Sequence, residues 1–83
     1  MIGYVTFRSI TPAQVAESVL RRAGMACMIQ RTPRWMAEQG CGYSLRLPQM
    51  ELRKAVSLLQ ENHIQYRKIY IKKENGAYEE VSL

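Results

Sequence analysis

The sequence predicts a small α+β protein in which two helices cover one face of an antiparallel sheet. Strand-like and helix-like segments follow one another in the order β-α-β-β-α-β, and Asn75-Gly76 is a strong hairpin signal near the end of the chain. The composition, with 47% hydrophobic and 23% charged residues, is typical of a globular protein. We therefore expect a ferredoxin-like two-layer sandwich with an extra C-terminal hairpin strand, and residues 1–83 as a single domain.

The first expected strand, 2–7, is rich in β-branched and aromatic residues. Thr11-Pro12-Ala13-Gln14 then has the pattern of a capping box, with Thr11 as the N-cap, and predicts a helix over 12–23. Gly24 follows as a left-handed C-terminal cap. The residues expected on the apolar face of this helix are Val15, Val19, Leu20 and Ala23.

Hydrophobic periodicity defines the later elements: Leu52, Ala55, Val56 and Leu59 recur at the spacing of one helix face, and Asn62 is the expected C-cap of that helix. The expected elements are a covered strand at 25–29, a half-buried strand at 43–47, a helix from Pro48 to residue 61, a strand at 64–73 and an edge strand at 78–83. Residues 31–42, which contain one proline and two glycines, show no period and predict a long connection. A connection of this length in so short a chain suggests a functional role.

The net charge of +5 predicts tolerance for an anionic partner, which could be nucleic acid, an acidic protein surface or a small oxyanion. A solvated basic face is the alternative. The chain has no basic leader and no apolar run of about 18 residues, so we expect a cytoplasmic protein that does not enter a membrane. Two cysteines and one histidine make a metal site improbable, and no cofactor is expected.

Cys41 is the candidate reactive residue. A strand order of 4-1-3-2 would bring Arg8, the 31–42 connection and the first helix N-terminus to the same end of the sheet, and cations or a helix N-terminus lower a thiol pKa. Gly40 and Gly42 would leave the sulfur open. The equally weighted alternative is a tight strand entry with a small residue in it. Cys27, in an apolar run, is expected in the core, and His63 is expected to be solvated or capping.

Several short motifs in this order resemble a family of small bacterial domains described as selenium/sulfur carrier-like. They are Val5-Thr6-Phe7-Arg8-Ser9, Ala23-Gly24, Thr32-Pro33-Arg34, Cys41-Gly42 followed by Arg46, and Ile64-Gln65-Tyr66. The resemblance covers most of the chain and implies that Cys41 holds sulfur or selenium as a persulfide or perselenide. It also implies that Arg8, Thr32, Pro33, Arg34, Gly42 and Arg46 are motif residues of the binding site. One departure is Glu38-Gln39-Gly40, where the family has serines.

The resemblance implies a carrier rather than a turnover enzyme, with sulfur or selenium donor and acceptor proteins as partners. The alternative function is a non-catalytic binding or regulatory module for a small anion or a protein. RNA binding is the less favoured alternative, because residues 42–47 offer one aromatic ring where RNA-binding sheets carry several. A homodimer through the edge strand 78–83 is a further expectation.

Overall fold

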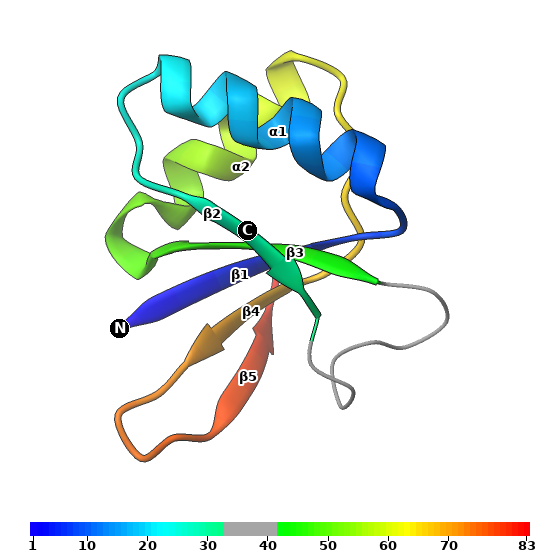
Figure 1. Ribbon diagram of the computed structural model, residues 1–83. Coiled ribbons are helices and arrows are strands. Elements are labelled where there is room, and N and C mark those ends of the chain that lie inside the picture. The colour runs from blue at the N-terminus through cyan, green and yellow to red at the C-terminus, as the bar shows by residue number, and fades with distance from the viewer. Residues whose placement is uncertain (33–41) are drawn as a thin grey trace.

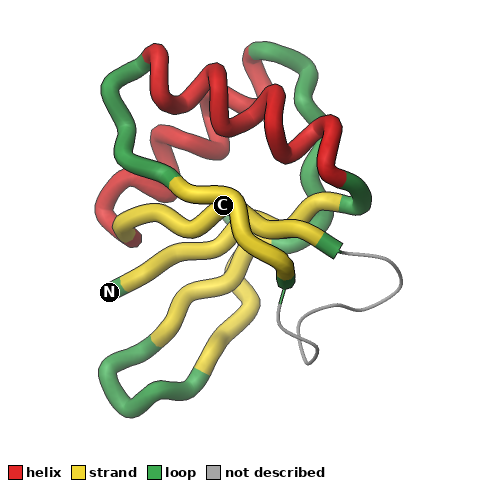
Figure 2. Tube along the Cα trace, in the orientation of Figure 1, coloured by secondary structure: helices red, strands yellow, loops and turns green. Residues whose placement is uncertain are grey.

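The computed structural model describes residues 1–32 and 42–83. Figure 1 labels its helices and strands, and Figure 2 distinguishes them from the connections. In chain order the elements are β1 (Ile2–Phe7), α1 (Ile10–Arg22), β2 (Met28–Arg31), β3 (Tyr43–Pro48), a single-turn 3-10 helix (Gln49–Glu51), α2 (Leu52–Glu61), β4 (Ile69–Lys72) and β5 (Tyr78–Val81).

The strands of the described residues form one five-stranded sheet in the order β2-β3-β1-β4-β5, and each neighbouring pair is antiparallel. Both helices lie on the same face of the sheet (Figure 1). The predicted α+β class and the order 4-1-3-2 of the first four strands agree with this arrangement, and β5 lies at an edge as expected. Within residues 1–32 and 42–83, the other face carries no helix, and we call it the open face.

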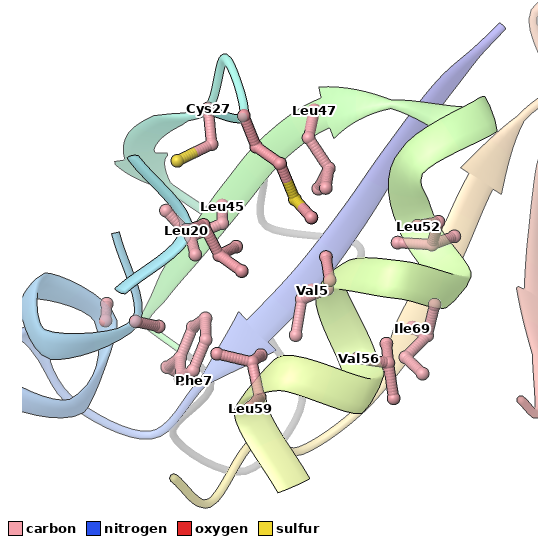
Figure 3. Packing of buried hydrophobic residues seen from close by; sticks show 14 residues of the cluster. Val5, Phe7, Leu20, Cys27, Leu45, Leu47, Leu52, Val56, Leu59 and Ile69 are labelled. Carbon is pink, nitrogen blue, oxygen red and sulfur yellow. The ribbon is translucent and has the colours of Figure 1, made fainter. Parts of the chain in front are cut away.

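The core lies between the sheet and the two helices (Figure 3). Strand residues alternate between the two faces, so Val5 and Phe7 of β1 and Leu45 and Leu47 of β3 point toward the helices. Phe7 is fully buried and lies beside Leu59 of α2 in Figure 3. The expected buried face of the second helix is confirmed at Leu52, Ala55, Val56 and Leu59.

The start and the buried face of α1 differ from the prediction. The N-cap is Ser9 rather than Thr11, and it makes no side-chain capping hydrogen bond. Pro12 therefore stands at the third helical position, which it can occupy because the first N–H groups of a helix have no partner within it. The helix buries Ala13, Ala16 and Leu20, whereas Val15 is 47% exposed. Small residues on the contact face let the helix approach the sheet closely.

The strand predicted at 25–29 begins later, at Met28, and lies at an edge of the sheet. Gly24 adopts a φ of +84° after α1, and the N–H groups of Gly24 and Met25 donate to the carbonyls of Arg21 and Leu20. This hydrogen-bond pattern is a Schellman motif, as Gly24 predicted. It turns the chain so that Met25 and Cys27 enter the core before the strand begins. The first part of the apolar run, residues 25–27, is therefore a core-filling connection, and only Met28 and Ile29 belong to the strand.

β4 is shorter than the strand predicted at 64–73, because the pairing with β1 changes at Thr6. The Arg67 N–H donates to the Thr6 carbonyl at 2.8 Å, and the Thr6 N–H donates to the Lys68 carbonyl at 2.8 Å. Two residues thus face one, which is the arrangement of a β-bulge. The buried Thr6 hydroxyl accepts the Lys68 N–H at 2.9 Å, so the side chain replaces a missing ladder bond.

The end of α2 and the last hairpin follow the prediction. Asn62 is the C-cap of α2, and its side-chain amide donates to the Leu58 carbonyl at 2.8 Å. The Asn75-Gly76 turn is confirmed by a φ of +86° at Gly76 and by a 2.9 Å hydrogen bond from its N–H to the Lys73 carbonyl. Pro48, expected to open the second helix, is the last residue of β3.

Candidate functional site

The connection that carries the candidate cysteine begins and ends at neighbouring points of the sheet. The Thr32 N–H donates to the Gly42 carbonyl at 3.0 Å, which extends the pairing of Arg31 with Tyr43 by one residue on each strand. Cys41, Pro33 and Arg34 of the predicted site lie outside the described residues.

Thr32 is buried, although a polar residue in a surface connection would ordinarily be solvated. It is 9% exposed, and its hydroxyl has no hydrogen-bond partner among the described residues. The buried Ser44 hydroxyl, on the open face of β3, also has no partner in this part of the chain. Buried hydroxyls without partners are uncommon. Both residues lie near the ends of the cysteine-bearing connection.

Arg8 lies at the same end of the sheet as Thr32 and Gly42. It directly follows β1, and the last residue of β1, Phe7, pairs with Tyr43 at the start of β3. Arg8 is exposed and directly precedes Ser9, the N-cap of α1. The residue is therefore adjacent in sequence to the N-terminus of the helix. The described residues thus agree with the predicted gathering of Arg8, the α1 N-terminus and the ends of the connection.

Arg46 does not belong to that group. It pairs with Tyr4 and Met28, three residues along β3 from Tyr43, which corresponds to about 10 Å of strand. Its guanidinium lies beside the Tyr4 phenol on the open face. Burial raises the pKa of Tyr4, hydrogen bonding and charge from Tyr78 raise it further, and Arg46 opposes the shift.

A cation–π contact that the sequence analysis missed lies at the start of β3. The Arg31 guanidinium carbon stands 5.6 Å from the centre of the Tyr43 ring. The two residues pair across β2 and β3, and directly opposite side chains in a sheet lie within reach of each other. The alternation of residues in the two strands was visible in the sequence, but the register between them was not.

Cys27 has the core position that its apolar surroundings predicted. It is 7% exposed, lies at the margin of the cluster in Figure 3, and directs its sulfur at the Glu17 carbonyl at 3.8 Å. Burial raises the pKa of this thiol, while Arg21 opposes the shift and Glu17 adds to it. Because the thiolate is the reactive form, Cys27 is a poor nucleophile.

His63 is exposed, as expected, and directly follows Asn62, the C-cap of α2. Its φ is +56°, its N–H donates to the Gln60 carbonyl at 3.1 Å, and the Ile64 N–H donates to the Leu59 carbonyl at 2.9 Å. This is a second Schellman motif, with histidine at the position that glycine usually occupies.

Within residues 1–32 and 42–83, no three His, Cys, Asp or Glu side chains come close enough to hold a metal ion. In the same part of the chain, neither helix has the length and hydrophobicity that a membrane span requires.

Residues 3–71 match the model of a protein family described as "Putative Se/S carrier protein-like". The match covers most of the 83 residues, so the chain belongs to this family. The matched segment includes both ends of the cysteine-bearing connection, and it also includes Arg8 and Arg46. No curated protein and no solved structure matches the chain.

Proposed function

We propose that the protein is a sulfur or selenium carrier in which Cys41 holds the cargo as a persulfide or perselenide. The family match carries this proposal, because it spans the segment that contains Cys41. Of the two cysteines in the chain, Cys27 is buried and its raised pKa disfavours the thiolate. Cys41 is therefore the better nucleophile by elimination.

The transfer needs no general base if the Cys41 thiolate is present at neutral pH. The thiolate attacks the outer sulfur of a donor persulfide, a new sulfur–sulfur bond forms on Cys41, and the donor's sulfur–sulfur bond breaks. The donor leaves as a thiolate, so no oxidant or reductant is consumed. Reversal of this step with an acceptor thiolate delivers the cargo. The protein is thus a carrier that acts between donor and acceptor proteins.

Arg8 and Arg34 would stabilise the thiolate, and the N-terminus of α1 would add to their effect. The exposed position of Arg8 beside the α1 N-terminus supports its part in this role. Thr32 and Gly42 would position the two ends of the connection, as their 3.0 Å hydrogen bond suggests. Arg46 lies about 10 Å farther along β3, so we propose that it contacts a partner protein instead of the thiolate.

We also propose that residues 1–83 form a single domain of the ferredoxin-like class, supported by the strand order and by both helices packing on one face. Cytoplasmic localisation and a homodimer through β5 stay predictions. Size-exclusion chromatography at high protein concentration tests the dimer.

RNA binding stays disfavoured. The side chains of Tyr4 and Tyr70 lie on the open face of the sheet, but they are only 5% and 7% exposed and so cannot stack on bases.

The direct test is incubation of the native protein with a persulfide donor, followed by mass spectrometry of the intact chain and its peptides. The expected product carries one additional sulfur on Cys41, and alkylation of Cys41 should show a pKa below the ordinary value of about 8.5. Cys41→Ser should abolish the adduct, while Cys27→Ser should retain it.

An adduct on Cys27, or none on either cysteine, would refute the carrier proposal. If Cys41→Ser also leaves partner binding unchanged, the alternative of a non-catalytic binding or regulatory module is favoured.

A further inference from the structure

A cavity of about 260 Å³ lies between the β1–α1 turn and the segment that leads into β4. The residues that line it are Arg8, Ser9, Pro12, Gln65, Tyr66 and Arg67. Two are arginines, three carry neutral polar side chains, and none is acidic. The cavity therefore concentrates positive charge on a small concave surface.

Neither arginine is neutralised within the described part of the chain. The ion pairs there join Arg21 with Glu17, Lys68 with Glu80 and Lys73 with Glu79. Lys68, which directly follows Arg67, has a carboxylate partner, but Arg8 and Arg67 have none among the described residues. Two arginines with no carboxylate partner in residues 1–32 and 42–83 thus line one cavity, and a guanidinium without such a partner has donors available to an anion.

The backbone around Arg67 is held in place before any ligand binds. The β-bulge at Thr6 fixes the Arg67 N–H on the Thr6 carbonyl at 2.8 Å, and the Thr6 hydroxyl takes the next N–H. The Tyr66 hydroxyl accepts a hydrogen bond from the Gln60 amide at 3.2 Å. Bulges redirect side chains and occur often beside functional sites. A preorganised backbone lowers the entropic cost of binding.

The first turn of α1 adds to the positive potential without forming the site by itself. Ser9 makes no capping hydrogen bond, and the turn contains no acidic residue. Ser9 thus gives the N–H groups of Ile10 and Thr11 no side-chain acceptor, and the described residues show no other; both groups lie beside the cavity that Ser9 and Pro12 line.

We propose that this cavity binds a small tetrahedral oxyanion of the phosphate and sulfate class, held by Arg8 and Arg67. The forked geometry of guanidinium matches two oxygens of such an ion. The volume is below the range of about 300–1,000 Å³ that is typical of sites for drug-sized molecules, so a small ion suits it better. The inference goes beyond sulfur transfer and does not depend on the chemistry of Cys41.

The test is a titration of the full chain with inorganic phosphate, followed by backbone amide resonances in ¹H–¹⁵N NMR spectra. Sodium chloride at matched ionic strength is the reference. Saturable shifts are expected at residues 8–11 and 65–67, with half-saturation at roughly 1 mM or below. Arg8→Ala and Arg67→Ala should each weaken binding about tenfold or more. Arg53→Ala, which removes the same charge from an exposed position on α2, should leave it unchanged.

The spectrum of each variant shows whether it is folded, and Arg67→Lys, which keeps the charge but loses the fork, gives a milder second variant. Shifts that do not saturate, or equal weakening by Arg53→Ala, would overturn the proposal. So would an oligonucleotide that moves these amides when inorganic phosphate does not. Titration of Cys41→Ser separates the two proposals, because phosphate binding should survive in that variant even though the sulfur adduct is lost.

Discussion

The two ends of the sheet differ in chemistry although the same strands cross both. At one end, where β1 stops and β3 starts, lie Arg8, Thr32, Gly42 and Arg67, and we call it the polar end. At the other, the apolar end, a cavity of about 360 Å³ is lined mainly by hydrophobic residues. They include Met1, Ile2, Cys27, Met28, Leu47 and Pro48, and Arg46 also lines the cavity.

This difference shows which end of the fold can carry reactive and polar side chains. The cysteine-bearing connection, the β1–α1 turn and the α2–β4 junction all meet at the polar end, and connections carry polar side chains without disturbing the core. At the apolar end the chain after α1 instead folds Met25 and Cys27 into the core. Cys27 therefore belongs to the packing, whereas Cys41 directly precedes Gly42, which lies at the polar end.

The largest expected effect is at the apolar end. Leu47→Ala should lower the free energy of unfolding by about 2–5 kcal/mol, because Leu47 is 3% exposed and its removal leaves a cavity. Urea denaturation measures it. Leu83→Ala is the matched control: Leu83 is 47% exposed, and the same truncation should change stability by less than about 0.5 kcal/mol. Similar losses in both variants would show that the apolar end is not well packed.

The next effect is at the polar end. Thr6→Val keeps the shape of the side chain but removes the hydroxyl that accepts the Lys68 N–H, so the free energy of unfolding should fall by about 1–3 kcal/mol. Thr6→Ser, which keeps the hydroxyl, should lose less. If the valine variant is as stable as the wild type, the hydroxyl does not support the bulge. The titration with inorganic phosphate, repeated on Thr6→Val, should then report whether Arg67 keeps its pairing with residue 6.

A smaller effect distinguishes the two helix C-termini. α1 ends at the apolar end with Gly24 in the left-handed region, and α2 ends at the polar end with His63 there. His63→Gly should raise the free energy of unfolding by about 0.5–1 kcal/mol, since glycine adopts this conformation without steric cost. Gly24→Ala should act in the opposite direction. Thermal unfolding measures both, and a destabilised His63→Gly would mean that the imidazole makes a contact that outweighs the strain.

The smallest effect is the pH dependence from Cys27. Burial raises its pKa in the folded protein above the ordinary value, so the folded state binds its proton more tightly than the unfolded state does. Its contribution to stability is complete below the unfolded pKa and is lost as pH rises through the folded pKa. Stability should thus decrease above about pH 9 in Cys41→Ser, which retains Cys27. Cys27→Ala should show a weaker decrease, and equal slopes would contradict the assignment.

Local patterns predicted much of the fold. Alternation identified β3, helical spacing identified the buried face of α2, and Gly24 and Asn75-Gly76 marked turns that the structure contains. These signals succeed because each depends on residues close together in the chain. The prediction of the α1 N-cap was wrong because it also depended on local residues alone. Pro12 fits any position in the first turn of a helix, and the local pattern could not choose among these positions.

The candidate site was predictable only in part. The family motif pointed to Arg8, Thr32 and Gly42, and the strand order brings these three to one end of the sheet. Arg67 was missed, because its place beside Arg8 depends on a bulge between segments about sixty residues apart. No local pattern marks it.

By itself, the sequence determined the α+β class, the core face of α2 and the turns, since periodicity and backbone preference act over a few residues. The family follows from the match over residues 3–71. Only the tertiary structure decided that Ala13 and Ala16 rather than Val15 face the sheet, that Met25 and Cys27 fill the core, and that Arg67 joins Arg8. The physical reason is that burial, strand register and cavity shape depend on which distant segments come into contact.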